Sequence, residues 1–199
     1  SGIALAFAKH PDYSVVLCDI DQRLAEQAWN RIGKKLDKQV QRGKLSQEET
    51  DRILSRIVPG LMNDLAECTL VLEAAFENMQ VKKSLFSQLK TICKSDTIFA
   101  SNTSSLSITE MGQEAGWGIV GMHFFNPAEV MKLVEVIAGE NTPPETVERV
   151  MRIVEEIDKI PVRVVEAPGF VVNRILVPMI NEAVTVFAEG TATAMDIDI

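Results

Sequence analysis

Residues 69–105 read TLVLEAAFENMQVKKSLFSQLKTICKSDTIFASNTSS, and this stretch decides the fold class. Two short apolar runs, Thr69–Ala75 and Thr97–Ser101, have the length and composition of strands. Between them an apolar residue recurs every four positions, at Val81, Leu85 and Leu89. That spacing is one face of a helix. The order strand, helix, strand predicts two parallel strands joined by a crossover.

Further apolar runs extend this pattern to six strands. They are Ser14–Asp19, Ile119–Phe124, Leu133–Ile137 and Val162–Val165. Helical patterns separate the early strands, which is typical of a parallel sheet covered by crossover helices. The sequence therefore predicts an α/β fold with a mostly parallel sheet.

A pair of helices is predicted between the first two of these strands. Apolar residues repeat every four positions at Leu24, Ala28, Ile32, Leu36 and Val40. Ser46 and Glu49 have the spacing of a capping box, which predicts a second helix over Ser46–Val58. With Gly43 as the joint, the two helices would run antiparallel and form a helical-hairpin lobe that stands off the sheet.

The last third of the chain shows a helix, a break and a second helix. Thr142 and Glu145 have capping-box spacing around Pro143 and Pro144, so a helix is predicted over Pro143–Asp158. The APG sequence at 167–169 is a break signal, after which apolar residues mark one long, largely buried helix to Gly190, kinked at Pro178. We therefore divide the chain into a sheet domain, 1–167, and the beginning of an all-helical domain, 168–199.

Both ends of the sequence predict a longer parent chain. SGIALAFAKH at the start is already a helical pattern with no preceding strand, and a new segment opens at Ala194–Asp198 and stops. We expect the first strand of the sheet and its glycine-rich loop to be missing ahead of Ser1.

Composition limits the class of protein. The chain has 199 residues, 46% of them hydrophobic, which suffices for a buried core in one or two domains. The formal charge of −8 argues against a general nucleic-acid or anionic-membrane surface, because either needs a field of lysine and arginine. A compact basic site is compatible with this charge.

Cysteine usage and the lack of targeting patterns bear on location. Cys18, Cys68 and Cys93 have no metal-ligand spacing, so we expect small core residues in a reducing compartment and no metal site. The sequence contains no signal-peptide pattern and no long uncharged apolar run. We expect a cytoplasmic protein that contacts neither membrane nor nucleic acid, with the mitochondrial matrix as the alternative.

Asp19 ends the first predicted strand, where a Rossmann-type sheet places the acid that binds the adenosine ribose of a dinucleotide. Ser1-Gly2, leading into an alanine-rich helix, is what would follow the last glycine of the phosphate-binding turn, and Asp19 then falls at the usual offset of about 20 residues. Because an acid would repel a 2′-phosphate, NAD is favoured over NADP. The alternative is a solvated strand end.

Residues 100–105, ASNTSS, directly follow a strand at the carboxyl edge, where open α/β sheets bind ligands. Their hydroxyl and amide groups could position a substrate oxygen and the nicotinamide ribose. The alternative is a turn in which Ser104 caps a helix running from Leu106.

His123 ends another predicted strand, and the run Leu133–Ile137 could return beside it and set Glu135 next to the imidazole. A carboxylate bonded to one ring nitrogen fixes the tautomer and leaves the other nitrogen free to take a proton. The pair would then be a general base with its orienting partner. The alternative is a core histidine and a glutamate on the solvated face of an edge strand.

Four longer motifs give a family resemblance. In chain order they are EAAFENMQVKKSLF, SNTSSLSIT, GMHFFNPAEVMKLVEVI and APGFVVNRILVPMINEA. Together they resemble the L-3-hydroxyacyl-CoA dehydrogenase family, including its members that act on 3-hydroxybutyryl-CoA. The resemblance covers essentially the whole chain. Four long motifs in the right order are far more specific than a single dinucleotide fingerprint.

The resemblance implies roles for particular residues. His123 is similar to the family's catalytic base and Glu135 to its partner. Ser104 and Asn173 match the residues at the substrate's 3-oxygen, and Asn126 matches a further polar residue of the active site. The resemblance assigns the NAD site to Asp19, Ala74, Glu77, Lys82 and Asn102.

The family's helical lobe contacts the coenzyme A nucleotide. Lysines of the corresponding lobe here, Lys34 and Lys38 among them, would pair with its phosphates. The ordinary alternative is a solvated helix face.

The resemblance as a whole implies reversible, NAD-dependent oxidation of an (S)-3-hydroxyacyl-CoA to the 3-oxoacyl-CoA, in a parent that forms a homodimer through its helical domain. Two alternatives stay open. One is a Rossmann-type dehydrogenase that acts on a free hydroxy acid. The other is a non-catalytic, crystallin-like relative that binds NAD without turnover.

Overall fold

The computed structural model describes residues 1–116 and 118–199, without the side chains of residues 114 and 115. The chain begins with α1 (Gly2–Ala8), β1 (Val15–Cys18), α2 (Gln22–Gln41), α3 (Gln47–Ser55), β2 (Ile57–Gly60) and the 3-10 helix η1 (Met62–Leu65). It continues with β3 (Leu70–Glu73), α4 (Met79–Ile92), β4 (Ile98–Ser101), α5 (Ile108–Ala115) and β5 (Val120–Phe124). It ends with β6 (Leu133–Ala138), α6 (Pro144–Glu156), β7 (Ile160–Val165), α7 (Val172–Ala188) and α8 (Ala194–Asp198).

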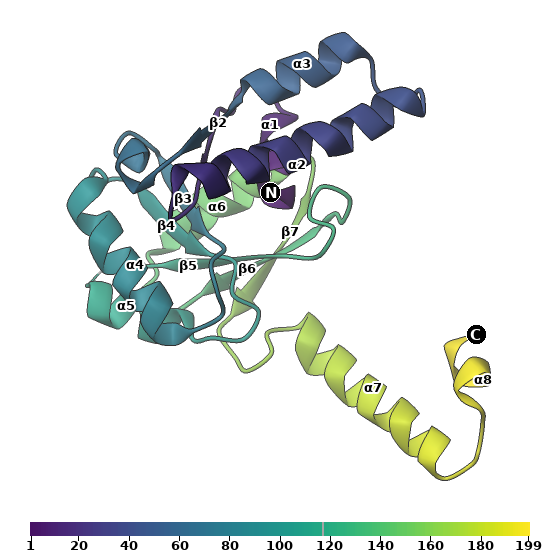
Figure 1. The fold of residues 1–199 in the computed structure, drawn as a ribbon. Helices are drawn as coiled ribbons and strands as arrows, with labels where there is room; N and C mark the ends of the chain where they lie inside the picture. Colours follow the sequence, from purple (N-terminus) through teal and green to yellow (C-terminus); the bar gives the residue numbers. More distant parts are fainter. Residues whose placement is uncertain (117) are drawn as a thin grey trace.

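The strands form two sheets (Figure 1). β1 and β2 make a parallel pair, and β3 to β7 make a five-stranded sheet in sequence order. Within the larger sheet only β5 and β6 pair antiparallel. The prediction of a mostly parallel α/β sheet is therefore confirmed. Because β3, β4 and β5 run in the same direction, their carboxyl ends share one edge of the sheet.

Helices cover both faces of the five-stranded sheet. Neighbouring residues of a strand point to opposite faces, so Val136 joins one hydrophobic cluster and Ile137 another. The first cluster packs α6 against the sheet through Val147, Val150, Ile153 and Val154. The second brings Phe86 and Leu89 of α4 and Met111 of α5 onto the other face. The result is a three-layer body with a core on each side of the sheet.

The predicted lobe is present as the helical hairpin of α2 and α3 (Figure 1). Gly43 lies between them with a positive φ of 66°, a conformation that glycine adopts without a steric penalty. The capping box of Ser46 and Glu49 is formed at the start of α3. A third cluster packs the lobe onto α1 and the small sheet, with Ile32, Leu36, Ile53, Leu5 and Ile57 buried in it.

The predicted helix over Ser46–Val58 is too long. α3 ends at Ser55, and Ile57–Gly60 forms a strand that the sequence analysis missed. β2 pairs with β1 in parallel, from Ile57 opposite Val15 to Gly60 opposite Cys18. The helical spacing of apolar residues happens to continue from Ile53 to Ile57, but pairing with β1 prevails over local pattern.

The predicted capping box of Thr142 and Glu145 is also wrong. α6 begins after Pro143, and its first turn has no side-chain cap. The Thr142 hydroxyl instead donates to the Ile119 carbonyl at 2.5 Å and accepts from the Gly139 N–H at 2.9 Å. Thr142 therefore fastens the turn between β6 and α6 to the start of β5.

The predicted long helix after the APG break is present as α7, but the prediction that it is largely buried is wrong. No residue of α7 is buried, although its composition is apolar. Figure 1 shows α7 leaving the α/β body, with α8 at its far end. The periodicity predicts an apolar face, but the described chain leaves this face exposed. The helix does continue through Pro178, and the predicted kink there stays a prediction.

Candidate active site

The histidine and the glutamate predicted to meet are neighbours in the sheet. His123 of β5 lies directly opposite Glu135 of β6 in the antiparallel register. The distance from His123 Nδ1 to Glu135 Oε2 is 2.7 Å. Both residues are buried, at 5% and 1% exposure. The pairing therefore sits in a site with little access for bulk water.

The second oxygen of Glu135 reaches the next element of the chain. Oε1 accepts hydrogen bonds from the N–H groups of Val171 and Val172, both at 2.9 Å. These N–H groups open α7, whose first turn has no side-chain cap of its own. The Phe170 ring lies 5.7 Å from the His123 ring between centroids. One carboxylate thus holds both the imidazole and the start of α7.

Ser104 and Asn173 are brought together, as the resemblance implied. The Asn173 side-chain amide donates to the Ser104 carbonyl at 3.2 Å. Ser104 is exposed in the loop after β4. It does not cap a helix from Leu106, because α5 begins at Ile108 with Ser107 as its N-cap. The alternative interpretation of Ser104 as a capping residue is therefore wrong.

Asn102 links the ends of two strands. Its side-chain oxygen accepts from the Phe124 N–H at 2.8 Å, and its own N–H donates to the Glu73 carbonyl at 2.8 Å. The residue joins the end of β4 to the ends of both neighbouring strands. The Asn102 side chain is therefore bonded to the residue that follows His123, at the shared carboxyl edge of the sheet.

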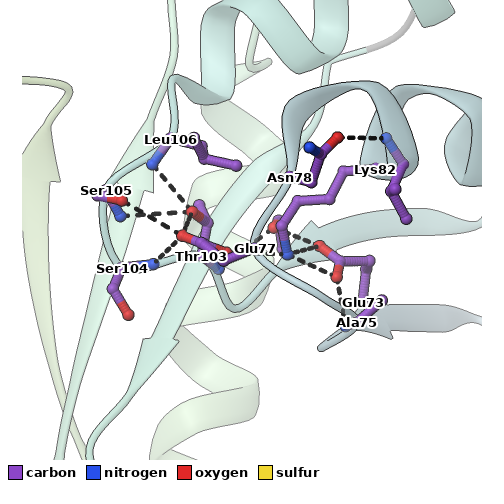
Figure 2. Close-up of polar contacts among 11 residues, drawn as sticks. Glu73, Ala75, Glu77, Asn78, Lys82, Thr103, Ser104, Ser105 and Leu106 are labelled. Carbon is purple, nitrogen blue, oxygen red and sulfur yellow. Dashed lines mark hydrogen bonds and ion pairs between the residues drawn. The ribbon is translucent and has the colours of Figure 1, made fainter.

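A buried polar network lies beside this loop (Figure 2). The Lys82 ammonium contacts Glu73 Oε1 and Oε2 at 2.7 and 2.8 Å, and Glu77 Oε2 at 3.2 Å. Glu77 in turn accepts from the Thr103 hydroxyl and from the Ser104 N–H at 3.1 Å. The network therefore connects the loop after β3 with the loop that carries Ser104.

Glu77 is held as a carboxylate by its donors. Partial burial acts to raise its pKa, but hydrogen bonds from Thr103, Lys82 and the Ser104 N–H outweigh burial and lower the pKa below the ordinary glutamate value. The side chain is still 40% exposed. Glu77 thus presents a fixed negative charge at the carboxyl edge of the sheet.

Two further predicted cofactor residues lie at strand ends. Asp19 follows β1 and is exposed, with Oδ1 accepting from the Ile20 N–H at 2.8 Å. Ala74 follows β3 and is also exposed. An exposed carboxylate after β1 fits the binding of two ribose hydroxyls, and a small side chain after β3 leaves room for a ligand. The residues present are therefore compatible with a dinucleotide.

The remaining predicted ligands of the substrate are exposed. Asn126 precedes Pro127 through a cis peptide bond in the loop after β5. Lys34 and Lys38 lie on the solvated face of α2. The lysine of α2 that the structure joins to the loop after β5 is Lys35, which pairs with Glu129. The run of basic residues in the sequence did not distinguish it from its neighbours.

Glu73 is a second residue that the sequence analysis missed. Its side chain has 0% exposure, and it organises the network around Lys82. The signal was present, because Glu73 falls on the same strand face as the buried Val71. Within the described residues, no group of His, Cys, Asp and Glu side chains could hold a metal ion. The described chain also contains no helix that is long and apolar enough to cross a bilayer.

Comparisons with known proteins give consistent descriptions. Residues 1–167 match the family model of the 3-hydroxyacyl-CoA dehydrogenase NAD binding domain, and residues 169–199 match that of the 3-hydroxyacyl-CoA dehydrogenase C-terminal domain. A 3-hydroxybutyryl-CoA dehydrogenase from Clostridioides difficile is 44% identical over 100% of this chain and 71% of its own. A 3-hydroxyadipyl-CoA dehydrogenase from Escherichia coli K12 is 41% identical over 100% of this chain and 42% of its own.

Solved structures agree with the sequence relatives. The crystal structure of an (S)-3-hydroxybutyryl-CoA dehydrogenase from Ralstonia eutropha superposes with a TM-score of 0.91 and 38% identity. The match covers 98% of this chain and 70% of that one.

Proposed function

The chain belongs to the 3-hydroxyacyl-CoA dehydrogenase family of NAD-dependent oxidoreductases, and from this premise we propose that His123 and Glu135 are its general base and orienting partner. The reaction would be the reversible oxidation of an (S)-3-hydroxyacyl-CoA to the 3-oxoacyl-CoA. The observation that carries the proposal is the 2.7 Å contact between His123 Nδ1 and Glu135 Oε2 in a buried site.

In this proposal each ring nitrogen of His123 has a separate role. Nδ1 faces Glu135, so Nε2 is the nitrogen left to take the proton of the substrate's 3-hydroxyl. As the C3–H bond breaks, a hydride leaves and the C3–O bond becomes a carbonyl. When bound, NAD supplies the hydride acceptor. The Glu135 carboxylate then stabilises the imidazolium that forms, and burial strengthens this attraction by excluding water.

Substrate and cofactor would be oriented by the neighbouring loops. We assign Ser104 and Asn173, which are hydrogen-bonded to one another, to the substrate's 3-oxygen. Asn126, in the loop after β5, would contribute a further polar contact. On the cofactor side, Asp19 would accept from the adenosine ribose. Ala74, Glu77, Lys82 and Asn102 would line the remainder of the site.

The class of substrate follows from the same premise. The names of the relatives include both hydroxybutyryl- and hydroxyadipyl-CoA, so we propose the class (S)-3-hydroxyacyl-CoA and no particular acyl group. The exposed Lys34 and Lys38 would meet the phosphates of coenzyme A.

We also propose a boundary between residues 167 and 168, and a homodimer formed through the helical domain. The exposed apolar residues of α7 support the dimer, among them Ile175, Met179, Ile180 and Phe187. Because the relatives reported above are bacterial, we propose that the protein is cytoplasmic.

The test is His123→Gln in the full-length protein, with acetoacetyl-CoA and NADH as substrates. We expect kcat to fall by about two orders of magnitude or more, the usual scale of acid–base catalysis, while NADH still binds. His10→Gln is the matched control, because His10 is the other histidine and its side chain contacts Asp158, which is 80% exposed, at 3.5 Å. A kcat close to wild type in His123→Gln would refute the assignment.

A further inference from the structure

Glu73 is a carboxylate in a place where the sheet would otherwise bury an apolar side chain. It ends β3, and its side chain has 0% exposure. Burying a charge is costly unless it is paired and hydrogen-bonded. Glu73 meets that condition in full. Oε1 and Oε2 both contact Lys82, Oε2 accepts from the Ser101 hydroxyl at 2.7 Å, and Oε1 accepts from the Ala75 N–H at 2.5 Å.

Lys82 connects the buried Glu73 to Glu77. The Lys82 side chain is 1% exposed, so bulk water does not compete for its ammonium. Its Nζ lies 3.2 Å from Glu77 Oε2 while it is also held by both oxygens of Glu73. The ammonium therefore bridges a buried carboxylate and one that is 40% exposed. Figure 2 shows Lys82 extending between the two acids.

Glu77 in turn fixes the loop that carries Ser104. Its Oε1 accepts from the Thr103 hydroxyl, from the Ser104 N–H at 3.1 Å and from the Ser105 hydroxyl at 3.4 Å. Thr103 Oγ1 also accepts from the Leu106 N–H at 2.9 Å, which closes the turn. The contacts thus run without interruption from the interior of the sheet to the exposed loop (Figure 2).

We propose that Glu73 is a positioning residue of the cofactor site, which acts through Lys82 to aim the Glu77 carboxylate and to set the loop that carries Ser104. The inference rests on the function proposed above and adds a residue to it. Glu73 touches neither substrate nor cofactor. Its effect is to hold the ammonium of Lys82 at one point, so that Glu77 keeps a single orientation for the dinucleotide.

A purely structural role is the competing explanation, and stability alone does not separate the two. A buried ion pair replaced by well-packed apolar side chains often leaves a protein as stable as before or more so. The double variant Glu73→Leu/Lys82→Met therefore restores packing without restoring the polar connection to Glu77. Because Lys82 is itself assigned to the cofactor site, the role of Glu73 is decided by Glu73→Gln, which keeps Lys82. If Glu73 only fills the interior, Glu73→Gln will bind NADH and turn over normally.

The experiment compares wild type, Glu73→Gln and the double variant in the full-length protein. NADH affinity is measured by fluorescence titration, kcat with acetoacetyl-CoA, and folding by thermal unfolding. We expect both variants to bind NADH at least about tenfold more weakly, which corresponds to the loss of one hydrogen bond to a charged group. The double variant should bind NADH more weakly even if its unfolding temperature equals that of wild type.

Glu110→Gln is the matched control. It removes a carboxylate partner of Lys83, at 2.9 Å; Lys83 is the next residue of the same helix, and Glu110 is 53% exposed. We expect wild-type NADH affinity in this variant. Wild-type affinity and kcat in the double variant, or in Glu73→Gln, would overturn the role of Glu73 while leaving the proposed function standing. A wild-type protein that does not bind NADH would overturn both proposals.

Discussion

At the scale of single residues, Glu135 serves two groups at once. Its Oε2 contacts His123 Nδ1, and its Oε1 accepts from the N–H groups of Val171 and Val172. The side chain is 1% exposed, so water cannot replace any of these partners. The orientation of the imidazole and the start of α7 therefore depend on the same carboxylate.

Because Glu135 contacts both His123 and the start of α7, Glu135→Gln is a direct test of the pairing of His123 with Glu135. The two backbone N–H groups can only donate, so the amide oxygen will face Val171 and Val172, and the amide NH₂ will face His123. Nδ1 must then accept, which moves the ring proton to Nε2 and removes the base. We expect kcat for oxidation of 3-hydroxybutyryl-CoA to fall by about two to four orders of magnitude, with a changed pH profile.

Glu140→Gln is the control for loss of one negative charge, because Glu140 is exposed just after β6. It should keep the wild-type kcat and pH profile. A Glu135→Gln enzyme with the wild-type profile would show that His123 and Glu135 are not coupled.

The sequence predicted some site residues and missed others for physical reasons. The pairing of His123 and Glu135 could be predicted because two consecutive strands of the chain often lie side by side. The structure adds the register, because the loop of residues 125–132 between them is too long to fix it. Glu73 could not be paired with Ser101, because that contact depends on which strand lies beside β3. Sequence spacing gives the face of a strand, but not its neighbour.

At the scale of elements, six strands were predicted and all six are present, as β1 and β3 to β7. β2 was missed because four residues with a proline and a glycine have little local strand signal, and only pairing with β1 defines them. The exposure of α7 could not be predicted either, since an apolar helix face does not say what covers it.

Two glycines bracket α7 and offer a prediction about its ends. Gly169 and Gly190 have φ of 76° and 73°, where any other residue is strained. A Cβ at Gly190 meets no atom within 4 Å, but one at Gly169 would lie 3.1 Å from the Arg174 N. In urea unfolding we expect Gly190→Ala to lower the free energy of unfolding by about 1 kcal/mol, and Gly169→Ala by roughly twice as much.

Only Gly169→Ala should also lower kcat, because the turn at Gly169 aims the two N–H groups at Glu135. Equal losses of stability, or an unchanged kcat in Gly169→Ala, would mean that the start of α7 adapts without disturbing the dyad.

At the scale of the whole molecule, three carboxylates connect separate segments. Glu77 joins the loop after β3 to the loop after β4, and Glu129 joins the loop after β5 to Lys35 of the lobe. Glu166, after β7, accepts from the Thr109 hydroxyl and from its N–H at 2.9 Å, at the start of α5. Each of these three acids therefore links two segments that are separate in the sequence.

All three carboxyl groups have a lowered pKa. In each case partial burial acts to raise the pKa, but hydrogen bonds outweigh it, and nearby lysines also lower the pKa of Glu77 and Glu129. For Glu166 the donors are Ser107, Thr109 and the N–H groups of the first turn of α5. The pKa of each group in the folded protein therefore lies below the ordinary glutamate value of 4.5.

The sign of the pH dependence follows from these shifts. Because the folded pKa lies below the unfolded one, the unfolded chain binds more protons in acid, and stability is lost as the pH falls below about 4.5 through the folded values. We expect the free energy of unfolding, from urea denaturation at a series of pH values, to fall over that window.

Glu166→Gln should be less stable than wild type at neutral pH and approach it in acid, because a protonated carboxyl resembles an amide. Glu26→Gln, at an exposed site on α2, should run parallel to wild type. Curves for Glu166→Gln and wild type that stay equally far apart at every pH would show that this carboxylate does not govern acid stability.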